Sequence, residues 1–260
     1  IVVAGSRVRL YPADPDVGVG RKGQTQTFFE LDLGVLPVDR AGYLSLVFSP
    51  QGLADGGTVH QLLKDSGRFA TGLAERLRAR IYEDVIPNLA IAIAHKRKAL
   101  SAPAEQIQSE LDEAYHQAMI LLFRMLFVAY AEDRGLLPYG VSEEYTSNAL
   151  KTLALRIQGK PDAPFDTKST SMWSDLKQVW EVIDVGDTDW GVPAYNGGLF
   201  TADPVKNKSG AVTYDLNLPN SVMGPAIRGL LLDVTAEGTL GPVDFRSLSG
   251  LYPFRDLMKL

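Results

Sequence analysis

One stretch of this sequence, residues 101–138, constrains the fold more than any other. Its apolar residues recur at intervals of three and four, the spacing that places side chains on one face of an α-helix. The residues of this stripe are Ile107, Leu111, Ala114, Ala118, Leu122, Met125 and Ala129. From Met119 to Ala131 nearly every position except Arg124 is apolar. A helix that is apolar on nearly all sides must be buried among other helices, so we expect a mainly α fold around it.

The two ends of this helix carry typical end signals. Ser101 is a suitable N-cap and Pro103 falls in the first turn, where a missing backbone N–H is tolerated. Gly135 is expected to stop the helix, and Pro138 follows three residues later. We therefore predict a helix that begins after Ser101 and ends just before Gly135.

The preceding sequence, residues 58–100, has the same helical period. Its apolar residues at that spacing are Leu62, Leu63, Phe69, Leu73, Leu77, Ile81, Val85 and Leu89. Pro87 is expected to kink this helix or divide it in two. Arg76, Arg78 and Arg80 are expected to make its outer face basic. Such a face is usually just solvated.

Residues 1–57 have a different pattern, with three predicted strands separated by turn residues. The strands are predicted at residues 2–11, 26–36 and 41–49. Helical periodicity begins after Gly57, so we predict a strand-containing piece at residues 1–57 and a helical connector domain at residues 58–260. The predicted fold class is mainly α: a helical bundle-like connector with a small N-terminal α/β piece.

Two shorter helices are predicted further along the chain, at residues 172–186 and 222–234. The first has an apolar side made of Trp173, Leu176, Val179, Trp180 and Ile183. The polar residues 159–170 before it are expected to form an exposed loop.

Composition excludes several classes of function. The chain has no cysteine, which excludes disulfide frameworks, thiolate zinc sites and cysteine nucleophiles. Its three histidines, His60, His95 and His116, lie far apart and in no metal-binding spacing. The net charge of −5 argues against a chain whose main task is to neutralise a phosphate backbone, although it is compatible with a local basic face.

Targeting signals are not visible in the sequence. No apolar run approaches the ~20 residues of a membrane-spanning helix, and no signal peptide is recognisable. The first residue is Ile1 rather than methionine, so the simplest interpretation is a piece of a longer polypeptide. We expect a cytoplasmic protein with no membrane partner.

Motifs for the commonest nucleic-acid and hydrolase chemistries are missing. There is no P-loop, no GxSxG elbow, no glycine-rich loop for S-adenosylmethionine and no [DN]PP[YF] loop. Glu30 and Asp32 alternate on a predicted strand, but no Glu-x-Lys occurs to complete a nuclease metal site. Glu132 and Asp133 are adjacent on a helix, so their side chains diverge by about 100°. We predict no catalytic, cofactor-binding or metal-binding residues in this chain.

Residues 194–200 read AYNGGLF, a tight turn between apolar residues. Asn196 can bond backbone groups, and Gly197 and Gly198 permit positive φ angles. The apolar residues expected to be buried on either side are Tyr195, Leu199 and Phe200. Free amides in such a turn could bind an anion, but no lysine or arginine lies within five residues. The pattern favours a structural corner over a ligand loop.

Three phrases in this sequence resemble a block of type IIG restriction–modification enzymes and of BREX or phage-growth-limitation adenine-specific DNA methyltransferases. They are LLFRMLFVAYAEDRGLLP at residues 121–138, GVPAYNGGLF at residues 191–200 and GPVDFRSLS at residues 241–249. The likeness covers roughly residues 27–249, and the chain departs from it where it continues as GLYPFRDLMKL. The family-motif or interface residues are Asp133, Arg134, Tyr195, Asn196, Gly197, Gly198, Phe200, Asp244 and Arg246.

The resemblance implies a helical connector between an N-terminal region, often a nuclease, and an adenine-N6 methyltransferase domain. The parent polypeptide would act on double-stranded DNA with S-adenosylmethionine, after flipping the target base out of the duplex, in bacterial phage defence. The connector would be a non-catalytic scaffold that positions the catalytic and DNA-recognition domains. Its possible contacts with the DNA backbone would be Arg76, Arg78 and Arg80.

Two alternatives stay open at this point. The chain could be a helical scaffold for a protein partner, without direct DNA contact. It could also be a hydrolase with a site around Asp133, Arg134 and Asn196. Asp133 and Arg134 are otherwise interpreted as a local capping and packing pair, or as an anchor for a neighbouring domain.

Overall fold

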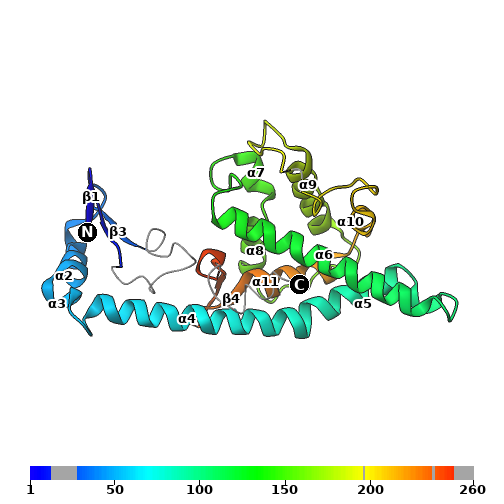
Figure 1. Ribbon diagram of the computed structural model, residues 1–260, viewed down its shortest axis with the longest axis horizontal. Coiled ribbons are helices and arrows are strands. Elements are labelled where there is room, and N and C mark those ends of the chain that lie inside the picture. The colour runs from blue at the N-terminus through cyan, green and yellow to red at the C-terminus, as the bar shows by residue number, and fades with distance from the viewer. Residues whose placement is uncertain (13–27, 196, 236–237, 249–260) are drawn as a thin grey trace. The chain divides into compact units, whose positions relative to one another are not determined.

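The fold is mainly helical, with a small antiparallel sheet of three strands near the N-terminus (Figure 1). The computed structural model describes residues 1–12, 28–195, 197–235 and 238–248. The predicted fold class is therefore confirmed.

The described residues belong to two compact units. One unit contains the described part of Ile1–Arg76 together with residues 247 and 248, and the other is Leu77–Arg246. The division falls inside the helix α4 (Thr58–Arg80). The predicted boundary after Gly57 remains a prediction.

The N-terminal sheet is formed by β1 (Val2–Ala4), β2 (Arg7–Leu10) and β3 (Phe29–Asp32), in the order β1-β2-β3. The single strand predicted at residues 2–11 is wrong, because this segment is a hairpin of β1 and β2 that turns at Gly5, which has a φ of 60°. The strand predicted at residues 26–36 is present in shorter form as β3. Glu30 and Asp32 form ion pairs with Arg9 and Arg7 of the neighbouring strand. These two carboxylates stabilise the strand pair.

The third predicted strand, at residues 41–49, is wrong, because this segment forms the helix α2 (Gly42–Phe48). Its most buried side chains are Leu44, Val47 and Phe48, which are three and four residues apart as on one face of a helix. Phe48 lies edge-on to Phe29 of β3, with 6.3 Å between ring centroids. In a short apolar run, the helical and strand periods are difficult to separate from the sequence.

Two short helices and one long one complete the elements of this region. They are the 3-10 turn η1 (Val38–Arg40), α3 (Pro50–Leu53) and α4. Ser49 caps α3 by accepting a hydrogen bond from the Gly52 backbone N–H, with 3.0 Å between the two atoms.

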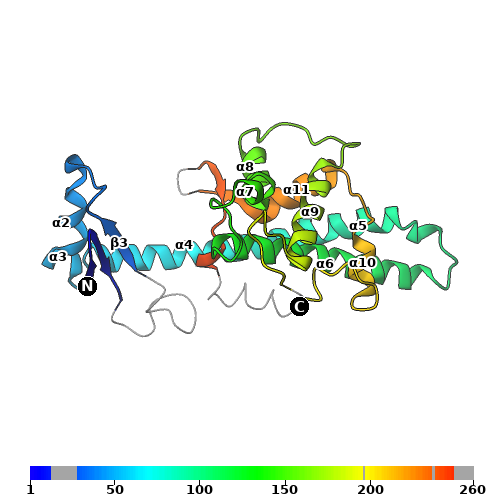
Figure 2. The same ribbon diagram turned by 90° about the horizontal axis from the view of Figure 1, so that it is seen from above.

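The second unit is built around the antiparallel helices α5 (Ile86–Lys96) and α6 (Ile107–Asp133) (Figures 1 and 2). A π-helical turn, η2 (Ile81–Val85), separates α4 from α5, and Pro87 lies in the first turn of α5. The predicted interruption near Pro87 is therefore present. Proline is tolerated at this position because the first N–H groups of a helix have no partner within it.

The beginning of α6 differs from the prediction, whereas its end agrees. Ser101 closes the 3-10 turn η3 (Ala99–Ser101), and α6 begins only at Ile107. At the other end Gly135 has a φ of 65°, and the Leu136 N–H donates to the Ala131 carbonyl over 2.9 Å. This is the left-handed glycine stop that the sequence predicted.

The remaining elements of this unit pack against α6 or against one another. They are α7 (Glu143–Asn148), α8 (Leu150–Gln158), α9 (Ser171–Val185), α10 (Lys208–Thr213), α11 (Asn220–Leu231), β4 (Leu232–Val234), β5 (Leu240–Pro242) and the 3-10 turn η4 (Phe245–Ser247). The predicted apolar side of α9 is buried. The predicted helix 222–234 is wrong at its end, because its last three residues form β4, which pairs with β5.

By length and composition alone, α6 could cross a membrane, contrary to the expectation that no segment would qualify. However, 72% of its most apolar window is buried inside the structure. The core helix of a folded domain meets the same criterion, and burial on this scale is typical of such a helix.

Candidate functional site

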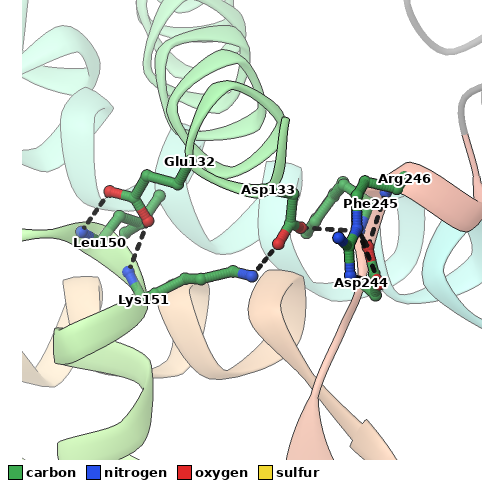
Figure 3. Close-up of polar contacts among 7 residues, drawn as sticks. All are labelled: Glu132, Asp133, Leu150, Lys151, Asp244, Phe245 and Arg246. Carbon is green, nitrogen blue, oxygen red and sulfur yellow. Dashed lines mark hydrogen bonds and ion pairs between the residues drawn. The ribbon is translucent and has the colours of Figure 1, made fainter. Parts of the chain in front are cut away.

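The C-terminal end of α6 brings together residues from all three sequence phrases. Figure 3 shows Glu132 and Asp133 at this end, facing α8 on one side and residues 244–246 on the other. Tyr195, from the second phrase, donates its hydroxyl to the Leu136 carbonyl over 2.6 Å. We call this meeting point the α6 junction: Glu132, Asp133, Leu136, Lys151, Tyr195 and residues 244–246.

Glu132 binds the first residues of α8 and is buried, with 4% of its surface exposed. Its Oε1 accepts from the Leu150 N–H and from the Tyr145 hydroxyl, each over 2.9 Å, and its Oε2 accepts from the Lys151 N–H over 3.0 Å. A carboxylate in this position caps the unpaired N–H groups at the start of a helix. Burial raises the pKa of Glu132 to about 7, and the three donors partly oppose this rise.

Asp133 joins α8 to η4 rather than capping its own helix. One carboxylate oxygen forms an ion pair with the Lys151 ammonium group, and the other accepts from the Phe245 N–H over 2.8 Å. Only 2% of the Asp133 side chain is exposed. Both partners lie in the same unit as Asp133, so the alternative that Asp133 and Arg134 anchor a neighbouring domain remains a prediction.

Arg134, the next residue, has an exposed side chain. Its guanidinium lies 5.9 Å from the centroid of the Tyr130 ring, one helical turn earlier. Arg134 therefore lies at the surface of the α6 junction, whereas Asp133 lies inside it.

Asp244, just before η4, and Arg246, within η4, form a bidentate ion pair. The Arg246 Nε and Nη2 lie 3.0 and 2.7 Å from the two carboxylate oxygens. Burial raises the pKa of Asp244, but the hydrogen bonds and charge of Arg246, with the charge of Lys151, outweigh burial and lower it. Because both side chains are about half exposed, water screens this pair and its contribution to stability is small.

The turn at residues 194–200 packs against the same helix through its aromatic residues. The ring of Phe127 in α6 lies edge-on to Tyr195 and Phe200, with centroid distances of 6.0 and 5.2 Å. Gly197 and Gly198 are exposed, and Asn196 falls outside the described residues. A Cβ atom built on Gly198 would meet no atom within 4 Å.

Arg124 is the residue that the sequence reasoning noticed but did not assign. It is fully buried in α6 and donates to the Leu199 carbonyl over 2.8 Å, the Thr213 hydroxyl over 2.7 Å and the Gly210 carbonyl over 3.0 Å. Burial lowers its pKa. A lone arginine in an otherwise apolar run was the signal that could have identified this anchor.

The guanidinium of Arg124 also lies against two aromatic rings. Its central carbon is 4.6 Å from the centroid of Tyr214 and 5.2 Å from that of Trp180. Arginine combines hydrogen bonding with stacking in this way because its guanidinium group is planar and weakly hydrated. Arg124 therefore fixes the YNGGLF turn and α10 to the core helix.

The three arginines of α4 do not share one environment. Arg76 and Arg78 are exposed, and Arg78 lies over the Tyr82 ring at 5.8 Å. Arg80 was predicted to lie on the outer face, but it donates to the Leu232 carbonyl over 2.8 Å and forms an ion pair with Asp233 at 3.3 Å. Its partners belong to β4, so the burial of this side chain follows from strand contacts that helical periodicity does not indicate.

A cleft of about 490 Å³ lies beside Arg80, within the second unit. Its walls are mainly apolar residues of η2, α11, β4 and β5, with Arg80, Asp84, Asn88 and Arg228 as the polar lining. None of the described residues of the α6 junction lines it. Among the described residues, no group of three or more His, Asp or Glu side chains is placed to hold a metal ion.

Comparisons of this chain with protein-family models, with curated proteins and with solved structures found no match. The family resemblance therefore remains a prediction from the three phrases.

Proposed function

We propose that this chain is the non-catalytic helical connector of a site-specific DNA adenine-N6 methyltransferase or restriction–modification enzyme. The observation that supports it is the α6 junction, where all three phrases of the resemblance come together. Residues separated by more than a hundred positions, such as Asp133 and Phe245, are hydrogen-bonded there. A shared structural role for the three phrases is what a connector needs.

The chemistry of the junction favours a structural role. Glu132 accepts three hydrogen bonds and Asp133 interacts with Lys151 and the Phe245 backbone, so both carboxylates hold elements in place. A general base needs a carboxylate that can reach a substrate proton. These two groups instead face neighbouring elements of their own unit (Figure 3).

In this proposal the complete protein supplies the chemistry outside the chain. Its methyltransferase domain would bind S-adenosylmethionine and methylate adenine in double-stranded DNA, in the cytoplasm. A neighbouring nuclease domain is the further partner that the resemblance implies. The exposed Arg76 and Arg78 are the candidates for contacts with the DNA backbone, and Arg80 is not, because its guanidinium binds β4.

The test uses the complete protein that carries this chain. Duplex DNA and S-adenosylmethionine are supplied, and N6-methyladenine is measured by mass spectrometry while DNA affinity is measured from 50 to 300 mM salt. We expect methylation, and an affinity that falls steeply with salt because cations on DNA are released on binding. Absence of duplex binding at low salt would reject the proposal.

A variant tests the connector role itself. Asp133→Ala removes the anchor of η4, so the methylation rate should fall while S-adenosylmethionine affinity, measured by calorimetry, stays the same. Asp244→Asn is the matched control, because it removes the charge of a half-exposed carboxylate at the same junction. An unchanged rate in Asp133→Ala would show that the junction does not position the catalytic domain.

A second candidate is a scaffold for a protein partner, and one observation favours it. Along the first part of α4, Leu62, Leu63 and Phe69 are exposed although they lie at helical spacing. Exposed apolar residues at such spacing are typical of a helix that a partner covers. Purification of the complete protein in a stable complex, without salt-dependent DNA binding, would favour this alternative.

A further inference from the structure

The loop between α5 and α6 forms an exposed end of the second unit. Figures 1 and 2 both show this helical hairpin reaching beyond the other elements of the unit. Of residues 95–106, which we call the hairpin tip, Ala99 alone is buried. The other elements of the second unit therefore leave the hairpin tip accessible to a large partner.

The hairpin tip is basic although the chain has a net charge of −5. It begins with the run HKRK at residues 95–98. Arg97 is held by Glu110 of α6, with 2.6 Å between Nη2 and Oε2. The ammonium groups of Lys96 and Lys98 are exposed and have no hydrogen-bond or ion-pair partner within the described part of the chain. Two lysines are thus available to bind an anion.

Lys98 also has an unusual backbone conformation. Its φ and ψ are 56° and 35°, the left-handed region, directly after the last turn of α5. Glycine is the usual residue there, because a Cβ atom in this conformation approaches the backbone too closely. The backbone alone would therefore favour glycine, so the lysine side chain is the feature that needs an explanation.

One explanation lies within the fold itself, because cations near the C-terminal end of a helix interact favourably with its dipole. Lys96 and Arg97 already occupy this end of α5, and Arg97 is also paired with Glu110. A third cation there, on a strained residue, adds little to the helix. A ligand outside the chain explains it better.

We propose that the hairpin tip binds the phosphate backbone of duplex DNA through Lys96 and Lys98. The inference rests on the proposed DNA-modification function and adds a second contact surface to Arg76 and Arg78. The three cations Lys96, Arg97 and Lys98 and the single acidic residue Glu105 give residues 95–106 a net charge of +2. Lysine ammonium groups on flexible stems suit phosphates, and such contacts hold a protein on DNA without reading sequence.

The test compares variants of the complete protein in binding to a fluorescent 30-base-pair duplex between 50 and 300 mM potassium chloride. In the double variant Lys96→Gln, Lys98→Gln, the slope of log affinity against log salt should become shallower by about 0.9 for each lysine removed. The control is Lys160→Gln, Lys168→Gln, which removes two exposed lysines of the loop before α9. Its slope should equal that of the unchanged protein.

A single variant separates binding from folding. Lys98→Gly removes one charge and relieves the left-handed residue, so the melting temperature should stay the same or rise while the slope becomes shallower. A lower melting temperature with an unchanged slope would show that Lys98 serves the helix end only, and would overturn the inference.

The same titrations distinguish the two proposals. If the unchanged protein binds duplex DNA and the double variant keeps its slope, the hairpin-tip inference fails and the proposed function stands. If the unchanged protein does not bind duplex DNA at low salt, the proposed function fails and the inference fails with it.

Discussion

Arg124 shows how one buried residue can position a turn that the sequence placed only as a motif. Its three donors reach two carbonyl groups and a hydroxyl on segments 75 to 89 residues away in the chain. Removing the guanidinium would leave the Leu199 carbonyl without this donor. The Thr213 hydroxyl and the Gly210 carbonyl would keep only the hydrogen bond that they make to each other over 2.6 Å. An unsatisfied buried polar group is costly, and this cost exceeds the net gain from forming a hydrogen bond.

We expect Arg124→Met to lower the free energy of unfolding by about 1–3 kcal/mol, the cost of leaving a buried neutral acceptor without its donor. The measurement is urea denaturation followed by circular dichroism. Arg78→Met, at an exposed position, should change this free energy by less than about 0.5 kcal/mol. Equal effects of the two substitutions would mean that Arg124 is not the anchor of the turn.

Glu132 is expected to make stability depend on pH. Burial raises its pKa in the folded protein to about 7, above the ordinary value of 4.5, so between these values the folded state binds a proton that the unfolded state does not. The contribution of Glu132 is therefore fully present below pH 4.5 and is lost as pH rises towards 7. Its size is up to about 3–4 kcal/mol, at roughly 1.4 kcal/mol for each pH unit between the two pKa values.

The measurement is the free energy of unfolding from pH 4.5 to 8, for the unchanged protein and for Glu132→Gln. Glutamine does not titrate, so the stability advantage of the unchanged protein over the variant should shrink as pH rises through this window. Glutamine keeps one carbonyl oxygen for Tyr145 and Leu150, which should let the variant fold. A difference that stays constant with pH would contradict the assignment.

At the scale of elements, Gly224 in α11 is a position that requires glycine, whereas Gly198 in the YNGGLF turn is not. A Cβ atom built on Gly224 would lie 2.2 Å from the Phe165 ring, whereas one built on Gly198 meets open space. Gly224 is therefore where α11 allows the loop before α9 to pack closely.

Gly224→Ala should lower the free energy of unfolding by about 1–3 kcal/mol, because the ring of Phe165 must move. Gly198→Ala should change it by less than about 0.5 kcal/mol. Both values can be read from thermal and urea unfolding of the two variants. The reverse order would show that the turn at residues 194–200 is the tighter of the two.

The elements that sequence reasoning predicted well are those with a long, unambiguous period. The stripe of α6 extends over several turns, and α9 has five buried residues on one side. The segment of α2 is too short to distinguish the two periods, and β4 was taken as helix because its partner β5 lies beyond the local pattern. Pairing with a distant strand is invisible to local periodicity.

The candidate site was only partly visible in the sequence for the same reason. The phrases named Asp133 and Tyr195, but their partners Phe245 and Leu136 are brought to them by tertiary folding. The left-handed Lys98 is a property of the folded backbone, and the residue type normally argues against it. The sequence thus indicated that Asp133 and Tyr195 were site residues, but it did not indicate the residues that they bind.

At the scale of the whole molecule, the core is unevenly distributed along the chain. Among the described residues before Leu77, only Val47, Leu73 and Ala74 are buried and apolar. Many of the large apolar residues of the second unit are buried, including Trp173 and Trp180. Since apolar burial is the main driving force of folding, the helical part should hold nearly all of the stability.

This argument predicts that residues 58–260 fold without the preceding 57 residues. Deleting those residues removes one of the buried apolar side chains above, Val47, so we expect a single cooperative transition. A loss of about 1 kcal/mol would lower the melting temperature by roughly 2–4 °C in a domain of this size. Calorimetry of the fragment beside the 260-residue chain measures both quantities. A fragment that melts without a cooperative transition would place residues 1–57 in the same cooperative unit and would remove the predicted domain boundary.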